Sequence, residues 1–514
     1  MRKQWVSCGL WLLVAAMVSA QSDTLHIPSM KEIYKQNDWL EGANPAGLAF
    51  NRFHSFSVAK VEYSHRNGNL GNDALPASGD IYSVESESFQ RLDKVSLYGK
   101  IAYIQSKNRE QNWNGMTSDY WQVVNLCDSV SGKQQSEKYR LAAAFSLPLS
   151  SHWVTGGEAD YEVQLTAKDT DPRNKNQWMK GRFTPGIAYR KKNFRLGTSF
   201  FYSGQKETVD YKNKSDHTTY PVLVSYPLGF FKTLAWREKV NWYYTGWEAG
   251  ASLQSDIRRY SFRFFQEMSG RRNRQTLVSN RIQNRKESES AGWQVMYKGK
   301  LHHATSFVRQ EWKWQAVFER ADVYDPLQRQ EESGRWVMEG KSLRSTRHIR
   351  CYALTYGYDQ LRDTWHPRLS FLSGILYRKA ETVLFFYPLE YSQPIHRFTV
   401  HAAFVRNFLL PDACLDISLG GRYEKGGGSV MKEKQLPADE IGPEITLWHH
   451  DSRMRQIFDY ETMGRWAVGV SLTYTRSFSP FRAFIQLSFD LEKMIENKVN
   501  SDYQKIKAHF GLLF

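Results

Sequence analysis

The sequence predicts an all-β fold, a single transmembrane antiparallel β-barrel with an even strand number of roughly 14 to 20 and a short N-terminal plug-like segment. Three observations support this fold class. The 514 residues are 14% aromatic, yet the mean hydropathy is -0.58. Apolar residues alternate with polar ones in many segments. Beyond residue 20, no apolar run reaches the ~20 residues that a membrane-spanning helix needs.

The first twenty residues are typical of a cleaved secretory signal peptide. Arg2 and Lys3 precede an apolar stretch at 5–18, and Ala20 ends a run of small residues suited to cleavage. An uncleaved membrane anchor is the alternative, but the apolar stretch is short for a span. We therefore expect a mature chain that begins near Gln21, exported to the outer membrane of a Gram-negative bacterium.

Residues 21–54 precede the first predicted strand and form a candidate lumen plug. They contain Trp39 and the run Asn44-Pro45-Ala46. This run resembles the short motif in the N-terminal hatch of the FadL-type long-chain fatty acid transporters, which implies a barrel closed by its own N-terminal segment. The Trp…Gly…Asn…Ala-Gly-Leu pattern also resembles the opening of an uncharacterised outer-membrane barrel family. A plain turn before the first strand is the alternative, because Asn-Pro favours turn initiation.

Residues 55–514 are predicted to form the barrel, because no Pro-rich or Ser-rich linker divides them into domains. Alternating segments give about 18 candidate strands, many of which begin or end with Trp or Tyr, as expected at membrane interfaces. Clear examples lie at 56–63, 153–165, 194–202, 247–253, 415–423, 466–475 and 483–491.

Short and long connections alternate toward the C-terminus, as expected for short periplasmic turns and long external loops. The short ones lie at 409–412 and 477–481, and the long ones at 425–463 and 493–503. Further long polar loops are expected at 105–136, 205–219, 270–289 and 321–347. The last of these has no clear place in the pattern and could hide a strand near Trp336.

The last strand carries the strongest signal. Its apolar members have period two and end on a C-terminal aromatic residue; they are Ile506, Ala508, Phe510, Leu512 and Phe514. This pattern resembles the C-terminal signature of bacterial outer-membrane barrels, which implies that Phe510, Leu512 and Phe514 act as a signal for the assembly machinery. The alternative is a half-buried strand that ends a soluble sandwich.

The chain is basic, with a formal net charge of +16. Its densest cluster begins with Arg271, Arg272 and Arg274, in the expected loop at 270–289. These arginines could bind lipopolysaccharide phosphates or attract an anionic solute, and the alternative is an ordinary solvated loop. Nucleic acid is the least expected partner of the positive charge, because the protein is expected to be exported.

No motif in the sequence indicates a catalytic, cofactor or metal site. Three cysteines remain after the predicted cleavage, and the spacing of Cys127, Cys351 and Cys414 does not indicate a disulfide framework. The histidine pairs 302–303 and 449–450 could bind a metal or act as bases, but solvated external loops are the expected setting. We predict no cofactor.

A channel or transporter for a small solute, passive or plugged, is the function that these features favour. The first alternative is a non-conducting accessory barrel within an outer-membrane complex for uptake, secretion or assembly. The second is a barrel enzyme with a rim site assembled from distant strands, for which no positive sign exists. Expected partners are membrane lipid, lipopolysaccharide, the assembly machinery and other outer-membrane proteins or lipoproteins.

Overall fold

The computed structural model describes residues 38–51, 54–117, 124–214, 221–233, 240–279, 285–362, 367–437, 448–479, 481–495 and 502–514. The predicted signal peptide at 1–20 lies outside these residues, so cleavage near Gln21 stays a prediction. Within them, no helix is long and apolar enough to cross a membrane.

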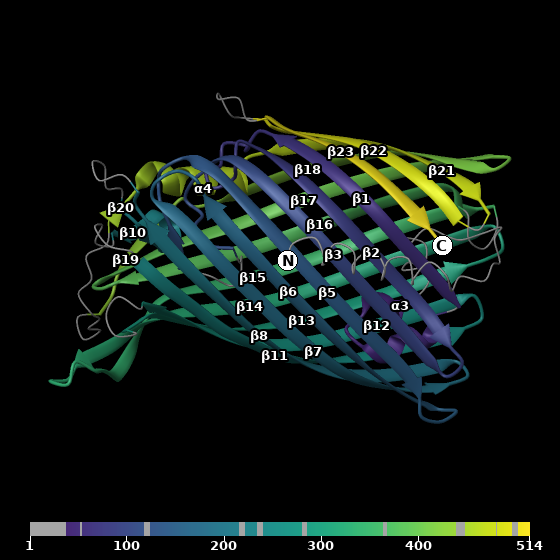
Figure 1. Ribbon diagram of the computed structural model, residues 1–514, viewed down its shortest axis with the longest axis horizontal. Coiled ribbons are helices and arrows are strands. Elements are labelled where there is room, and N and C mark those ends of the chain that lie inside the picture. Colours follow the sequence, from purple (N-terminus) through teal and green to yellow (C-terminus); the bar gives the residue numbers. More distant parts are fainter. Residues whose placement is uncertain are drawn as a thin grey trace, which may run out of the picture.

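Eighteen antiparallel strands close into one barrel (Figure 1), which confirms the predicted fold class and strand number. Strand β23 returns to pair with β1, so no edge of the main sheet is left open. The strands are β1 (Ser55–Asn67), β2 (Ser78–Leu92), β3 (Val95–Gln111), β5 (Gly132–Pro148), β6 (Trp153–Lys168), β7 (Arg173–Lys191), β8 (Phe194–Lys212), β11 (Val240–Arg259), β12 (Phe262–Ser279), β13 (Arg285–Ala304), β14 (Val308–Gln330), β15 (Trp336–Leu361), β16 (Pro367–Phe386), β17 (Leu389–Leu410), β18 (Ala413–Gly428), β21 (Arg465–Phe478), β22 (Phe481–Met494) and β23 (Asp502–Leu513).

The two faces of each strand differ as the alternation predicts. On β8, Phe200 and Tyr202 are 61% and 60% exposed, while Ser199 and Ser203 are each 2% exposed. On β23, Ile506 is 52% exposed. Because exposed side chains of this size are apolar on strand after strand, the outer surface suits lipid and the inner surface suits a polar lumen.

The short turns distinguish one end of the barrel from the other. Short turns join β17 to β18 and β21 to β22, as predicted, and they share one end of the barrel with the C-terminus (Figure 1). There Phe514 and Ser57 exchange two backbone hydrogen bonds of 2.9 Å. We call this the turn end and the opposite one the loop end.

Three of the expected loops are largely strands, so these predictions are wrong. Strand β8 continues through 205–212 of the loop expected at 205–219. Strand β12 runs through much of 270–289 and β13 begins at Arg285, while β14 and β15 occupy most of 321–347 as a long hairpin. The strand suspected near Trp336 is the start of β15. These stretches extend beyond a membrane-sized strand. Polar and apolar residues are mixed on both of their faces there, with Leu277 and Val323 on the inner face, so the apolar period that marks a strand is lost.

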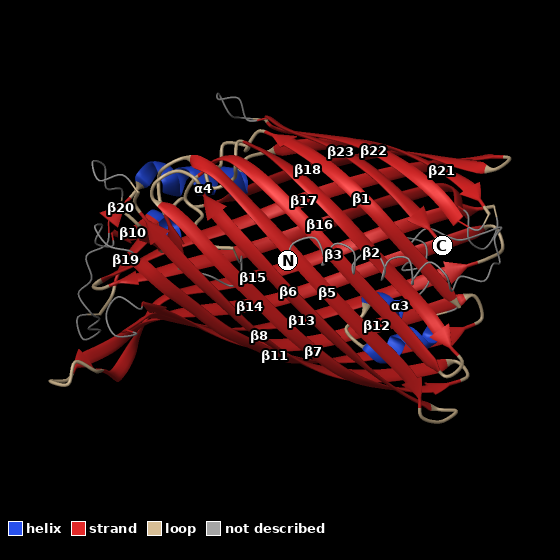
Figure 2. Cartoon of the chain, viewed as in Figure 1, coloured by secondary structure: helices blue, strands red, loops and turns tan. Residues whose placement is uncertain are grey.

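The loop end carries a second, small sheet and a helix. The sheet has the order β20 (Trp448–His449), β10 (Phe230–Thr233), β9 (Leu223–Ser225) and β4 (Asn125–Cys127). Helix α4 (Asp451–Thr462) and a 3-10 turn, η2 (Pro227–Gly229), lie beside it, and β19 (Lys432–Gln435) pairs with β17. Figure 2 shows these helical pieces at the loop end.

The described part of the N-terminal segment lies near the turn end, where Figure 2 shows the other helical pieces. It comprises a short helix, α3 (Asp38–Glu41), and a 3-10 helix, η1 (Pro45–Phe50). Its partners are residues on the inner face of strands far along the chain, as described next.

Candidate functional site

Three lumen-facing glycines on adjacent strands make room for the N-terminal segment. They are Gly156 on β6, Gly186 on β7 and Gly197 on β8, and Gly156 pairs with Gly186. A Cβ atom on Gly186 would lie 2.2 Å from Oδ1 of Asn44, and one on Gly156 would lie 2.7 Å from the backbone nitrogen of Ala46. Only a residue without Cβ permits such an approach. We call these three residues the glycine strip.

Asn44 joins the segment to the wall through its side chain. Its Nδ2 donates to the carbonyl oxygens of Ile187 and Thr198, each at 3.1 Å. Its Oδ1 accepts from the backbone N–H of Ala46 at 3.0 Å and so caps η1, whose first residue is Pro45. The Asn-Pro run therefore both starts a helix and anchors it to the barrel.

Trp39 fills an apolar pocket beside this anchor. It is 1% exposed, and its ring lies edge-on to Phe50 and Phe265 at centroid distances of 5.0 and 5.9 Å. Its Nε1 donates to Oδ2 of Asp256 at 3.2 Å, so the buried indole N–H is satisfied.

Asp38 binds three basic groups of the lumen wall. Its Oδ1 lies 3.2 Å from Nζ of Lys300 and 3.0 Å from Nε2 of His302, and its Oδ2 lies 3.2 Å from Nη1 of Arg263. The carboxylate is fully buried. Burial raises the pKa of Asp38, but attraction to His302, Arg263 and Lys300 outweighs burial and holds this pKa well below its usual range. Asp38 is therefore ionised at neutral pH.

Asp38, His302 and Glu311 also form the group best placed to hold a metal within the described ranges, with ligand atoms within 4.8 Å of one another. The imidazole uses Nε2 toward Asp38 and Nδ1 toward Glu311, the latter at 3.2 Å. The two carboxylates thus lie on opposite sides of the ring, and Lys300 and Arg263 already supply positive charge. This arrangement suits an ion-pair network rather than a metal centre.

The loop end contains a cluster of apolar contacts. A cluster that we call the apolar cap joins the connections to the inner faces of the strands. Its members are Met116, Val124, Leu126, Val222, Val224, Tyr226, Leu228 and Phe230 from the connections, and Val209, Tyr211, Trp242, Tyr244, Leu277, Ala321, Val323 and Leu384 from the strands. The sequence did not predict this cap, because each of its connections reads as a polar loop.

The predicted histidine candidates have structural partners. His302 is 8% exposed on β13, so the expected solvated loop is wrong for it. The ring of His449 packs on Phe230 at 4.4 Å between centroids and lies 2.7 Å from Oδ1 of Asp451. His450 accepts from a backbone N–H of α4 and caps that helix.

The three cysteines Cys127, Cys351 and Cys414 are free. Burial raises the pKa of the Cys127 thiol, in the small sheet, to about 12. A thiol with such a pKa is protonated at neutral pH and is a poor nucleophile.

The predicted arginine cluster is divided between the two faces of β12. Arg271 faces inward, where its Nη1 lies 2.9 Å from Glu248. Arg272 and Arg274 face outward, and Arg274, half exposed, lies 2.8 Å from Glu289. Adjacent strand residues point to opposite faces, so the three arginines do not form one site.

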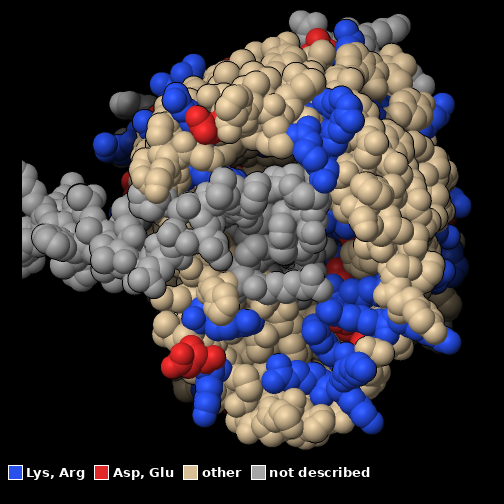
Figure 3. Space-filling view, turned by 90° about the vertical axis from the view of Figure 1, so that its right-hand side faces the viewer, with Lys and Arg blue, Asp and Glu red and all other residues tan. Residues whose placement is uncertain are grey.

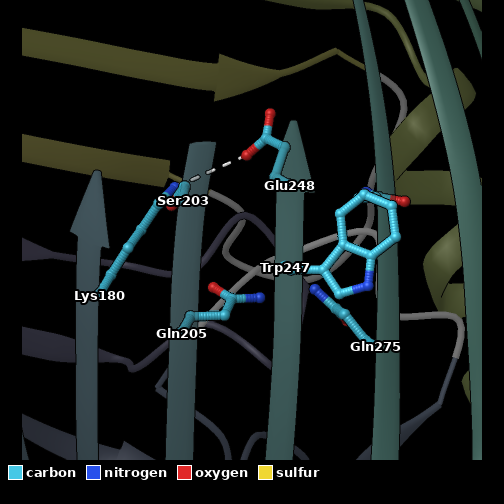
Figure 4. Close-up of a pocket in the computed structure, with 7 residues that line it drawn as sticks. Lys180, Ser203, Gln205, Trp247, Glu248 and Gln275 are labelled. Atoms are coloured by element: carbon cyan, nitrogen blue, oxygen red, sulfur yellow. Dashed lines mark ion pairs between the residues drawn. The ribbon is translucent and has the colours of Figure 1, made fainter. Parts of the chain in front are cut away.

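A small polar pocket lies on the inner wall beside Arg271. Within it, Lys180 and Glu248 form an ion pair of 3.8 Å (Figure 4). The residues that line the pocket are Lys180, Ser203, Gln205, Trp247, Glu248, Asn273 and Gln275. The wall at this level offers charged and amide groups to a solute.

The turn end has a basic rim. Figure 3, which looks onto this end, shows many Lys and Arg side chains and few Asp or Glu. Exposed basic residues in its turns are Lys94, Lys191, Lys192, Arg259 and Arg362.

Comparison with known proteins gives two kinds of result. No curated protein matches the sequence. Among solved structures, the fold is similar to BauA, the ferric preacinetobactin receptor from Acinetobacter baumannii, at 6% identity and a TM-score of 0.43, over 90% of this chain and 80% of that one. It is also similar to the RagAB peptide transporter, at 7% identity and a TM-score of 0.42, over 90% and 86%. The copper transporter OprC gives 10% identity and a TM-score of 0.40, over 90% and 83%.

A family model matches residues 45–514, from the first residue of η1 to the C-terminus. The match includes every strand of the barrel and the end of the Asn44-Pro45-Ala46 run. It agrees with the predicted resemblance to an uncharacterised barrel family, whereas the resemblance to FadL-type transporters rests on that run alone. The chain belongs to the family of unknown function DUF6850.

Proposed function

We propose that this chain is an outer-membrane transporter for a small polar solute, and that its N-terminal segment plugs the lumen. The observation that carries the proposal is the fit of Asn44 and Ala46 to the glycine strip of the inner wall. A segment that merely preceded the first strand would need no such complementary surface. The charged wall around it favours a polar solute over the fatty acid that the FadL resemblance implies.

The proposal further requires that the plug can move. Its hydrogen bonds and ion pairs with the wall can be replaced by water and solute groups, since exchange of polar partners changes the free energy little. Movement must also expose the apolar contacts of Trp39 and Leu48 with the wall. The apolar cap covers the other end, so transport requires both closures to open in turn.

Conductance of the full chain in planar lipid bilayers tests the plug. We expect the wild-type protein to conduct weakly and Gly186→Val to conduct at least about tenfold more, because the new side chain occupies the place of Asn44. The matched control is Gly204→Val on the neighbouring strand, where an added Cβ meets nothing within 4 Å. Equal conductance of the wild type and both variants would reject the plug.

A second candidate function, an accessory barrel in an envelope complex, draws support from the basic rim at the turn end. The rim would contact an acidic periplasmic partner. Copurification from envelope membranes in mild detergent tests this role. A stoichiometric partner that is lost when Lys191 and Lys192 are both changed to Glu, together with absent conductance of Gly186→Val, would favour it over transport.

We also propose that the outward Arg272 and Arg274 bind lipopolysaccharide phosphates, while the inward Arg271 does not. Lipopolysaccharide that copurifies with the protein should fall in the double variant Arg272→Gln/Arg274→Gln and stay unchanged in Arg271→Gln. A fall in both variants would contradict the assignment. We also propose that the assembly machinery recognises Phe510, Leu512 and Phe514.

A further inference from the structure

Two arginines on neighbouring strands oppose each other on the inner wall below α4. Arg378 on β16 and Arg397 on β17 are direct cross-strand partners. Their strand neighbours Tyr377 and Phe398 are 39% and 44% exposed on the outer face, so the two arginines point into the lumen. Like charges directly opposite each other are destabilising, and such a pair needs an anion between them.

Glu461, in the last turn of α4, supplies that anion. Its Oε2 accepts from Nη1 of Arg378 at 2.9 Å and also from Nη2 of Arg397. An acidic side chain in the last turn of a helix is unfavourable for the helix itself, because that end carries partial negative charge. The position of Glu461 is therefore explained by the two arginines and not by the stability of α4.

The remaining carboxylates of this wall have other partners. Glu424 lies 2.5 Å from Arg465 and 3.1 Å from Arg422, and only its contact of 3.3 Å with Arg397 reaches the pair. Glu492 lies 2.9 Å from Arg422 and 3.3 Å from Arg465. Among the described residues, Glu461 is the carboxylate that forms an ion pair with Arg378, and without it Arg397 would keep only its contact with Glu424.

Two further observations show that the site is accessible and not saturated. The side chain of Glu461 is 26% exposed, whereas that of Glu424 is 8% exposed. Within the residues that the structure describes, the buried Nε of Arg397 donates no hydrogen bond. An ion pair that water already reaches can be exchanged for another oxyanion at modest cost.

We propose that Arg378 and Arg397 form a lumen subsite for an oxyanion, a carboxylate or phosphate group of the solute, and that Glu461 occupies it as an internal substitute. Two guanidinium groups side by side match the oxygens of either anion. A solute oxyanion that displaces Glu461 would at the same time release the end of α4 from the wall. The subsite assigns an oxyanion-bearing solute to the proposed transport function, and its role in the protein rests on that function.

Calorimetric titration of the full chain in a zwitterionic detergent at low salt tests the subsite, with inorganic phosphate and succinate as separate probes. Removing the internal competitor with Glu461→Gln should tighten binding of at least one probe by about tenfold. The matched control is Asp459→Asn, which removes the same charge from the same helix and should bind as the wild type does. In Glu461→Gln/Arg378→Gln/Arg397→Gln, the gain should vanish.

Equal affinity of the wild type and Glu461→Gln, or a gain that survives loss of both arginines, would overturn the proposal. Tighter binding of phosphate only or of succinate only identifies which oxyanion the subsite accepts. The binding assay needs no transport, so anion binding without conductance in Gly186→Val would reject the transporter and leave the subsite standing.

A measurement on the wild-type chain covers the case in which Glu461→Gln does not fold. Limited trypsin digestion at constant ionic strength should cleave α4 after Arg453 or Arg455 faster in phosphate or succinate than in chloride, because displacement of Glu461 loosens the helix. Identical cleavage in all three salts would contradict displacement.

Discussion

The two ends of the barrel hold their inner segments by different proportions of polar and apolar contacts. At the turn end, the ion pairs of Asp38 and the hydrogen bonds of Asn44 hold the N-terminal segment. Small apolar clusters around Trp39 and Leu48 add to them. At the loop end, the apolar cap holds the connections through contacts such as those of Leu126 and Phe230, which are buried in one cluster. Polar closures can exchange partners with water or solute, whereas an apolar closure must expose its area to open.

Single substitutions should therefore differ in their energetic cost between the two ends. Removing one charge at the turn end leaves other buried charges without a partner, a large local penalty. Removing one side chain at the loop end leaves a cavity whose cost depends on how well the cluster relaxes. The predictions below separate these cases, from the largest expected effect to the smallest.

Asp38→Asn should loosen the N-terminal segment most strongly. It removes the carboxylate that Lys300 and His302 share with Arg263, which keeps its ion pair with Asp256, and breaking a buried ion pair costs about 3–5 kcal/mol. Hydrogen exchange of the backbone amides in 38–51 should accelerate accordingly. The control, Glu339→Gln, breaks an exposed pair with Arg329 and should change nothing measurable. Unchanged exchange in Asp38→Asn would show that the ion pairs do not hold the segment.

Leu126→Ala should weaken the apolar cap by about 2–5 kcal/mol, because the fully buried side chain leaves a cavity. Protease cleavage in the connection before β5 should become faster. Exchange of the amides in 38–51 should keep its wild-type rate, because the two closures share no contact that the described residues reveal. A simultaneous rise at both ends would instead mean that the closures are coupled.

Trp39→Phe should have a smaller effect than Asp38→Asn. It keeps most of the aromatic packing on Phe265 but removes the hydrogen bond to Asp256, a loss of about 1.5 kcal/mol for a bond to a charged group. The same amide exchange measures the loss. An effect as large as that of Asp38→Asn would mean that packing, not charge, dominates the turn end.

Mild acid should not weaken the ion pairs between Asp38 and the lumen wall. The pKa of this carboxyl is lowered in the folded protein, so its stabilising contribution is present above the unfolded pKa of about 3.9 and is lost only as pH falls through the lower folded value. The difference in amide exchange between the wild type and Asp38→Asn, corrected for intrinsic rates, should therefore be no smaller at pH 5 than at pH 7. A difference that shrinks at pH 5 would contradict the lowered pKa.

The sequence predicted the barrel well because lipid imposes a strict period on every strand. It failed where that constraint ends, in the extensions of β12 and of the β14–β15 hairpin, where polar and apolar residues are mixed on both faces. Asn44, Pro45 and Ala46 could be singled out because the run is local. The contacts of Asp38 could not be predicted, since Lys300 and His302 stand 262 and 264 positions away. His302 was noted as part of a histidine pair, but nothing in the sequence links it to Asp38.

The pairing of β1 with β23 has a consequence for how the molecule is made. Ser57 and Phe514 meet across nearly the whole chain, so the ring cannot be sealed before the final residues have been synthesised. Such distant contacts form slowly. A chain without β23 would leave the borders of β1 and β22 unpaired, and its N-terminal segment would have an open seam through which to leave.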